Sequence, residues 1–452
     1  MDSRFQHVTT EELTQWLSDL IKIKTVPVDA NEIEAANYIK DIFESEGLKP
    51  TIYESDPGRA TLYLRIPGKS GNPKLMLSGH IDVVPAETEH WKYPPYSGEI
   101  VDGEIWGRGA IDCKGLVVMM MGVVVELTRS KTLLEDDLVI LFLADEEAFG
   151  QYGAKYMVEQ FPDLVNIPYV IQEGGGMMVQ LHNDWYCFVN NAEKGAFSGR
   201  IHFLGVPGHG SMPRVSDNPV KKLAKAIELL SNHQTEINVS EDVLHQISEM
   251  SESNLTKFLF SKKRIAGFMM NHPPKAMKDF VGLIDAMIRP TIAVTMLQAS
   301  DKINVIPGSA SLDFDCRVLP GQGWQTVEKE IARALKGKVE YKLEHLGREN
   351  ALPGNASTCD TPMFEVLSEV INSYIPNIKP IPFQVPGATD SRFFREHFGS
   401  IAYGFMPLKL EGEISEFSNL VHGRNERLSI ENLQFGSDIL LDLTLKFLGD
   451  SH

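Results

Sequence analysis

Short apolar segments alternate with amphipathic helices over residues 9–172, and this alternation limits the possible folds most strongly. Parallel strands need long crossover connections, and the helices in those connections then cover both faces of the sheet. The sequence therefore predicts an α/β fold with a mixed, largely parallel sheet. The expected strands are 61–66, 74–77, 138–143 and 169–172, and the expected helices are 9–23, 31–46, 115–129 and 153–160.

The pattern changes near Gly195 to the order β-α-β-β-α-β, which is typical of a small ferredoxin-like α+β domain. Its expected strands are 197–204, 291–297, 311–317 and 338–345, and its expected helices are 219–230 and 326–335. We therefore expect a larger, discontinuous domain formed by residues 1–195 and 350–452, with an inserted domain over 196–349. An extra segment of the inserted domain, about 236–289, is predicted to be helical and receives no role.

The charge balance and the cysteine spacing argue against several classes of partner and site. A formal net charge of −18 argues against nucleic acid or an anionic membrane. The four cysteines are scattered and form no C-x-x-C pair, which argues against a disulfide framework or a cysteine-based zinc site.

The N-terminus lacks an apolar signal core, and the longest apolar run, 116–127, is too short to cross a bilayer. The sequence thus predicts a soluble, cytoplasmic protein.

Candidate metal ligands stand where the predicted strands end. His80 and Asp82 follow strand 74–77, which we expect to end at Ser78-Gly79, and their side chains leave one face of the backbone. A histidine that donates one ring N–H to a carboxylate commonly offers its other nitrogen to zinc. A lone H-x-D pattern is more often a satisfied surface or core histidine, so its meaning depends on the rest of the chain.

Further carboxylates and a late histidine extend this set. Asp112 lies in the Gly-rich loop 107–115, Asp145-Glu146-Glu147 follows strand 138–143, Glu173 follows strand 169–172, and His422 lies in the polar loop 420–426. An isolated Asp-Glu-Glu is more often a solvated turn, but here acid follows acid at successive strand ends. Imidazole and carboxylate donors suit zinc, and this set exceeds the needs of one tetrahedral ion. It suffices for two ions bridged by one carboxylate.

These motifs give the sequence a family resemblance. The chain resembles the dinuclear zinc peptidases and deacylases that include acetylornithine deacetylase, succinyl-diaminopimelate desuccinylase, aminoacylase and carboxypeptidases G and S. The matching motifs follow the family order from about residue 75 to 430: Ser78–Asp82, Gly107–Gly115, Asp145–Glu147, Glu173–Gly175, Gly208–Ser211, Asn304–Pro307, Ala388–Arg392 and His422. Cys113 departs from the Asp or Met usual at its position, and the 236–289 insertion is similar to that of the carboxypeptidase S branch.

The resemblance implies a ligand set for two zinc ions. His80 and Glu173 would bind one zinc, and Glu147 and His422 would bind the other. Asp112 would bridge the two ions. Cobalt or manganese would be substitutes for zinc.

The resemblance also implies roles for residues that bind no metal. Asp82 would orient His80, and Glu146 would be the general base. We expect Glu146 and Glu147 to take different roles because adjacent side chains leave an extended strand end in opposite directions. His209 would act on the active site of a partner subunit, and the substrate's carboxylate or backbone would be held by Asn304, Arg317, Thr389 and Arg392.

The implied activity is that of a dinuclear zinc amidohydrolase or metallopeptidase that cleaves an amide or peptide bond next to a free carboxylate. The substrate class stays open between an N-acyl amino acid, as for a deacetylase or aminoacylase, and a short peptide, as for a carboxypeptidase or dipeptidase. The implied architecture is a catalytic domain with an inserted lid or dimerisation domain, in a homodimer. The alternative is a non-catalytic binding or scaffold homologue of the same fold, which predicts a lost base or ligand. None is missing.

Overall fold

The computed structural model describes residues 4–181, 183–237, 285, 287–347, 351–410, 417 and 419–449. The chain divides into two compact units. Unit 1 comprises Met1–Asn191, Ser357–Phe383 and Thr389–His452, and unit 2 comprises Ala192–Ala356 and Gln384–Ala388. Most of the predicted helical segment 236–289 lies outside the described residues.

Unit 1 is built on a ten-stranded mixed sheet whose central strands β6, β3, β7 and β17 run parallel. The strands follow the spatial order β1 (Thr51–Asp56), β2 (Arg59–Ile66), β6 (Asp137–Leu143), β3 (Pro73–His80), β7 (Tyr169–Gln172), β17 (Ile401–Gly404), β9 (Asp184–Glu193), β8 (Met177–Leu181) and β18 (Leu408–Lys409), and β16 (Lys379–Val385) pairs with β9. The α/β class with a mixed, largely parallel sheet is therefore confirmed.

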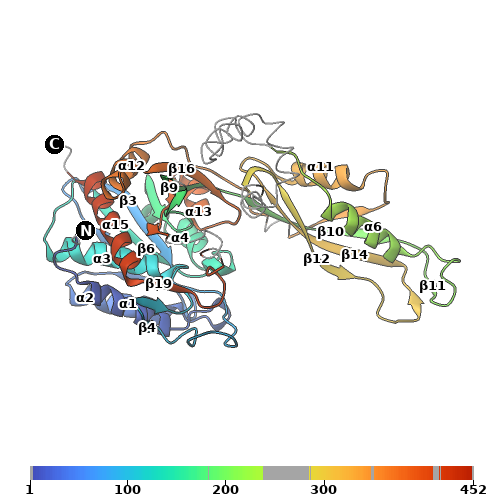
Figure 1. Ribbon diagram of the computed structural model, residues 1–452, viewed down its shortest axis with the longest axis horizontal. Coiled ribbons are helices and arrows are strands. Elements are labelled where there is room, and N and C mark those ends of the chain that lie inside the picture. Colours follow the sequence, from blue (N-terminus) through green and yellow to red (C-terminus); the bar gives the residue numbers. More distant parts are fainter. Residues whose placement is uncertain are drawn as a thin grey trace. The chain divides into compact units, whose positions relative to one another are not determined.

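Helices cover both faces of this sheet, as the apolar strands require. Strand β6 is buried along its whole length, with Leu138, Ile140 and Phe142 in one core and Val139, Leu141 and Leu143 in another. The first core is completed by α1 (Thr10–Lys22), α2 (Glu32–Ser45), α3 (Lys114–Arg129), α12 (Pro362–Tyr374) and α15 (Ile430–Leu448) (Figure 1). The second is completed by α4 (Ala154–Gln160), α5 (Pro162–Val165) and α13 (Ser391–Phe398).

The expected end of strand 74–77 is wrong. β3 continues through Ser78 and Gly79 to His80, paired with β6 as far as Leu143. The small residues fit a crowded position in mid-sheet, since a Cβ at Gly79 would lie 3.2 Å from Val117 Cγ2. Sequence patterns also missed β1, the β8–β9 hairpin, β16 and a three-stranded sheet of β4 (Glu99–Val101), β5 (Glu104–Trp106) and β19 (Arg427–Ser429).

Unit 2 contains a four-stranded antiparallel sheet with the order β12 (Thr291–Gln298), β14 (Ser309–Val318), β10 (Gly195–Leu204) and β15 (Lys342–Leu346). Helices α6 (Pro219–Ser231) and α11 (Trp324–Leu335) pack on it around an apolar core. Along the chain, these elements follow the β-α-β-β-α-β order. A separate two-stranded ladder joins β11 (Gly208–His209) to β13 (Val305–Ile306). Among the described helices, none is long and apolar enough to cross a membrane.

Candidate metal centre

The five predicted ligands meet at one edge of the unit 1 sheet. The parallel strands β3, β6 and β7 all end at this edge, which is where open α/β sheets place their ligands. His80 is the last residue of β3, Glu173 follows β7, and Glu147 lies in a short 3-10 helix, η2 (Glu146–Ala148), after β6. Asp112 stands two residues before α3, and His422 stands in the loop before β19.

The Asp112 carboxylate lies between the two imidazoles. Its Oδ1 is 3.0 Å from His80 Nε2, and its Oδ2 is 3.0 Å from His422 Nε2. Glu173 Oε2 is 3.3 Å from His80 Nε2, and Glu147 Oε1 is 3.2 Å from His422 Nε2. Two clusters result, each with one histidine and one carboxylate of its own, and they share Asp112.

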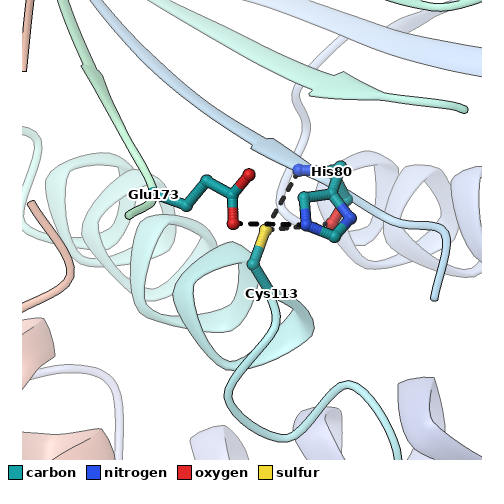
Figure 2. Close-up of side chains that lie close together, drawn as sticks. All are labelled: His80, Cys113 and Glu173. Atoms are coloured by element: carbon teal, nitrogen blue, oxygen red, sulfur yellow. Dashed lines mark hydrogen bonds and ion pairs between the residues drawn. The ribbon is translucent and has the colours of Figure 1, made fainter. Parts of the chain in front are cut away.

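His80 is the most firmly held of the five side chains. Its Nδ1 lies 2.9 Å from the backbone oxygen of Asp82. Because a carbonyl oxygen only accepts a hydrogen bond, this contact places the ring proton on Nδ1. The lone pair of Nε2 is then available to bind a metal. Cys113 secures the backbone, since its Sγ accepts from His80 N at 3.1 Å and donates to His80 O at 3.3 Å (Figure 2). Sequence patterns assigned Cys113 no role, and Figure 2 shows its sulfur beside the His80–Glu173 pair.

Asp82 has a second contact that the sequence did not predict. Its carboxylate oxygens accept the backbone N–H groups of Glu146 and Glu147 at 3.1 and 3.0 Å. The carboxylate reaches His80 Nδ1 only at 3.5 Å. Asp82 therefore orients His80 through its backbone and fixes the acidic turn through its side chain.

Glu146 and Glu147 do not leave an extended strand, so the geometric reason given for their different roles is wrong. Asp145 adopts a left-handed conformation with φ 68°, and its backbone oxygen accepts from Ala148 N at 3.1 Å and Gly150 N at 2.7 Å. This turn ends the extended chain after β6 and places both glutamates in η2.

The electrostatics of the cluster favour a bound cation. Burial, together with neighbouring carboxylates, raises the pKa of Glu146 and Glu147, and it raises the pKa of Glu173 to about 7. Hydrogen bonds to Asp112 and Glu147 raise the pKa of His422 to about 10. A raised pKa means that these carboxyl groups hold protons more tightly than usual. Divalent cations bound among them would replace those protons and neutralise the charge of the carboxylates. The donor set therefore fits a metal centre.

The other predicted site residues are divided between the units. In unit 1, Thr389 precedes α13, and Arg392, which is buried, donates from Nη2 to Phe149 O at 2.9 Å. In unit 2, His209 Nδ1 lies 2.8 Å from Ser211 Oγ, and Gly210 N donates to Asn304 O at 2.8 Å. Arg317 lies on β14, where its Nε donates to Asp315 Oδ2 at 2.8 Å. Their roles toward a substrate stay predictions.

Two buried acids at the site were not predicted from the sequence. Asp390 is fully buried, and burial raises its pKa to about 8. Glu426 is fully buried next to the loop that carries Asp112. Both lie inside motifs that drew attention for a neighbour, Thr389-Asp390-Ser391-Arg392 and His422-Gly423-Arg424-Asn425-Glu426. Each acid lies within four residues of a predicted site residue, and this proximity was the available signal.

The fold is α/β, and the donor set fits a metal. The model of peptidase family M20/M25/M40 matches residues 76–446, and the chain belongs to this family. The predicted family membership is thereby confirmed. The family consists of metal-dependent hydrolases, so the protein is a metallopeptidase or a related amide hydrolase.

Relatives named for several different activities resemble the chain. It is 29% identical over 437 residues to the N-fatty-acyl-amino acid synthase/hydrolase PM20D1 of Xenopus tropicalis, covering 94% of this chain and 83% of the relative. It is 29% identical over 377 residues to a probable carboxypeptidase S-like 2 of Dictyostelium discoideum, covering 79% and 68%. A probable succinyl-diaminopimelate desuccinylase of Staphylococcus aureus is 26% identical, with 85% and 86% covered.

Solved structures share the fold. An M20 family metallo-carboxypeptidase from Sulfolobus solfataricus superposes with a TM-score of 0.69 at 18% identity, covering 96% of this chain and 98% of the other. Human carnosine dipeptidase 1 superposes with a TM-score of 0.68 at 16% identity, covering 97% and 96%.

Proposed function

We propose that the protein is a hydrolase with two zinc ions that cleaves an amide or peptide bond next to a free carboxylate. The observation that carries this proposal is the Asp112 carboxylate, with one oxygen 3.0 Å from each of two imidazoles. His80 and Glu173 would hold one ion, Glu147 and His422 the other, with cobalt or manganese as substitutes. The complete donor set disfavours the alternative of a non-catalytic homologue.

The chain's own residues would share the remaining work. Bound zinc lowers the pKa of water and polarises a substrate carbonyl. Glu146, whose pKa is raised by burial and by neighbouring carboxylates, would take a proton from the attacking water and deliver it to the departing amine. His209 would donate a hydrogen bond to the carbonyl oxygen as negative charge develops there.

The substrate would be a small N-acyl amino acid or a short peptide with a free carboxylate. Relatives named as an N-fatty-acyl-amino acid hydrolase and a carboxypeptidase support both chemistries. Arg317 and Arg392 would hold the carboxylate that an acidic protein otherwise repels, and Asn304 and Thr389 would hold the substrate backbone. A homodimer and a cytoplasmic location remain part of the proposal.

Turnover of matched substrates tests this function. Zinc-loaded protein should hydrolyse members of a panel of N-acyl amino acids and dipeptides, and chelation should abolish that turnover. Arg392→Lys should reduce kcat/KM for a free-acid substrate at least 10-fold more than for its C-terminal amide, because an ammonium lacks the bidentate grip of a guanidinium. Equal losses on both substrates would contradict the role of Arg392, and a panel without any turnover would contradict the function.

A further inference from the structure

The loop that carries Asp112 and the loop that carries His422 are joined by a buried ion pair. We propose that this pair, the Arg108–Glu426 clasp, is a positioning device that builds the His422 half of the metal centre. The inference deepens the proposed function and rests on it. The two residues are far apart in sequence, and neither side chain has a hydrogen bond or ion pair with an imidazole ring.

Glu426 holds the loop that carries Asp112. Its Oε1 accepts the backbone N–H groups of Gly109, Ile111 and Asp112 at 3.1, 2.9 and 3.1 Å. Its backbone oxygen accepts from Gly107 N at 2.9 Å. One carboxylate oxygen thus gathers three amides of the loop, including the amide of the bridging residue, and sets the direction in which the Asp112 side chain leaves the loop.

Arg108 holds the loop that carries His422. Its Nη1 lies 2.6 Å from Glu426 Oε2, and its Nη2 donates to the backbone oxygens of His422 and Gly423 at 3.0 and 2.9 Å. The His422 backbone has a left-handed φ of 58°, a conformation that is uncommon for a residue other than glycine. The side chains of Arg108 and Glu426 are 4% and 0% exposed, so water competes little for these contacts.

The two halves of the centre differ in their need for such support. His80 ends a buried strand and has Asp82 and Cys113 as partners. The His422 side chain is 52% exposed, and within the described part of the chain the only hydrogen-bond or ion-pair partners of its ring are the carboxylates of Asp112 and Glu147. Its position therefore depends on its backbone, which the clasp holds. Loss of the clasp should weaken the His422 half and leave the His80 half intact.

Zinc titration against a competing chromophoric chelator tests the inference without measuring turnover. Wild-type protein should bind two zinc ions. Arg108→Lys keeps the charge but cannot reach Glu426 and both carbonyls together, and Glu426→Gln keeps an acceptor for the amides but loses the ion pair. Each variant should bind one zinc normally and the other roughly 10- to 100-fold more weakly, the usual effect of removing a residue that supports a ligand.

The double variant Arg108→Lys/His422→Ala shows whether Arg108 acts through His422. If it does, the double variant binds the weakened zinc no worse than His422→Ala alone. Arg65→Lys is the control for a change to an ion pair away from the site. Arg65, which is exposed, pairs with the buried Asp137 at the opposite end of β6, and this variant should keep both affinities. Circular dichroism confirms folding, and Arg108→Lys carries the test if Glu426→Gln does not fold.

The outcomes separate the two proposals. Wild-type protein that binds no zinc overturns the proposed function and the clasp with it. Two zinc ions in wild type with unchanged affinities in both clasp variants overturn the clasp alone. Equal weakening of both zinc ions, or the same loss in Arg65→Lys, also overturns it, because either result indicates general disruption of the unit.

Discussion

Asp82 shows how much of the site rests on a single residue. Its backbone oxygen sets the His80 tautomer, while its carboxylate accepts two amides of the turn that carries Glu146 and Glu147. The strand that ends at His80 and the turn that carries Glu146 and Glu147 are therefore fixed relative to each other by one residue, whose side chain is fully buried. Such support around a metal ligand often matters nearly as much as the ligand.

At this scale, Glu146 and Glu147 are expected to behave oppositely although they are adjacent. Glu147→Gln should weaken zinc binding, because Glu147 Oε1 lies 3.2 Å from His422 Nε2 in one cluster of donors. Glu146→Gln should keep both zinc ions and lower kcat by roughly 100- to 10,000-fold, the usual contribution of a general base. Metal analysis beside single-turnover kinetics measures both effects. The roles are reversed if Glu146→Gln loses metal while Glu147→Gln keeps it.

That the candidate ligands lie close together was partly predictable from topology. His80, Glu147 and Glu173 stand at the ends of parallel strands, which share one edge of the sheet, whereas Asp112 and His422 lie in loops that this rule does not place. The details depended on backbone conformation that composition does not encode. The left-handed Asp145 turned Glu146 and Glu147 out of the extended chain, and the contacts of Glu426 required knowledge of a loop hundreds of residues away.

Among the elements, the turn between β6 and α4 is tightly constrained at Gly150. Gly150 has φ 65°, and its amide closes the turn on Asp145 O. A Cβ at this position would lie 2.4 Å from Asp390 Oδ1 and 3.0 Å from Phe393 Cε2. The turn can approach α13 closely only because the residue has no side chain.

Replacing this glycine should therefore destabilise the protein beyond the cost of backbone strain. Gly150→Ala should lower the free energy of unfolding by about 1–3 kcal/mol more than Gly47→Ala, through contact with Asp390. Gly47 has a similar φ of 82°, and a Cβ there would meet no heavy atom within 4 Å, so it isolates the backbone term. Chemical denaturation of both variants gives the difference. Equal losses in the free energy of unfolding would contradict this prediction, because the turn would then shift to accommodate the added Cβ at no cost.

Elements whose apolar residues recur with a clear helical or strand period were predictable, and elements without such a period were not. Helix α1 begins at a capping box in which Thr9 Oγ1 accepts from Glu12 N at 3.2 Å and Glu12 Oε2 accepts from Thr9 N at 2.8 Å. The strand β16 is largely half-exposed, and the strands of the small β4–β5–β19 sheet have three residues each. They exist because partners elsewhere in the chain offer hydrogen bonds, and local sequence carries little signal of that kind.

For the whole molecule, the untested expectation is that His209 of one chain serves the active site of another. Mixing Glu146→Gln protein with His209→Ala protein under conditions of subunit exchange should restore about a quarter of wild-type activity, since half of the dimers are mixed and each has one intact site. Glu146→Gln mixed with His80→Ala is the control and should restore nothing, because both lesions lie in unit 1. Proven exchange without recovery would assign His209 to its own chain.

The central place of β17 has a consequence for synthesis. β7 ends at Gln172 and β17, its neighbour in the sheet, begins only at Ile401, after the whole of unit 2 has been made. Chains fold from the N-terminus as they emerge from the ribosome, so β7 must wait with an unpaired edge while the inserted unit is translated. Such an edge can pair with the same edge of another nascent chain. A chaperone that shields β7 during this interval would therefore raise the yield of folded protein more than one acting on the finished chain.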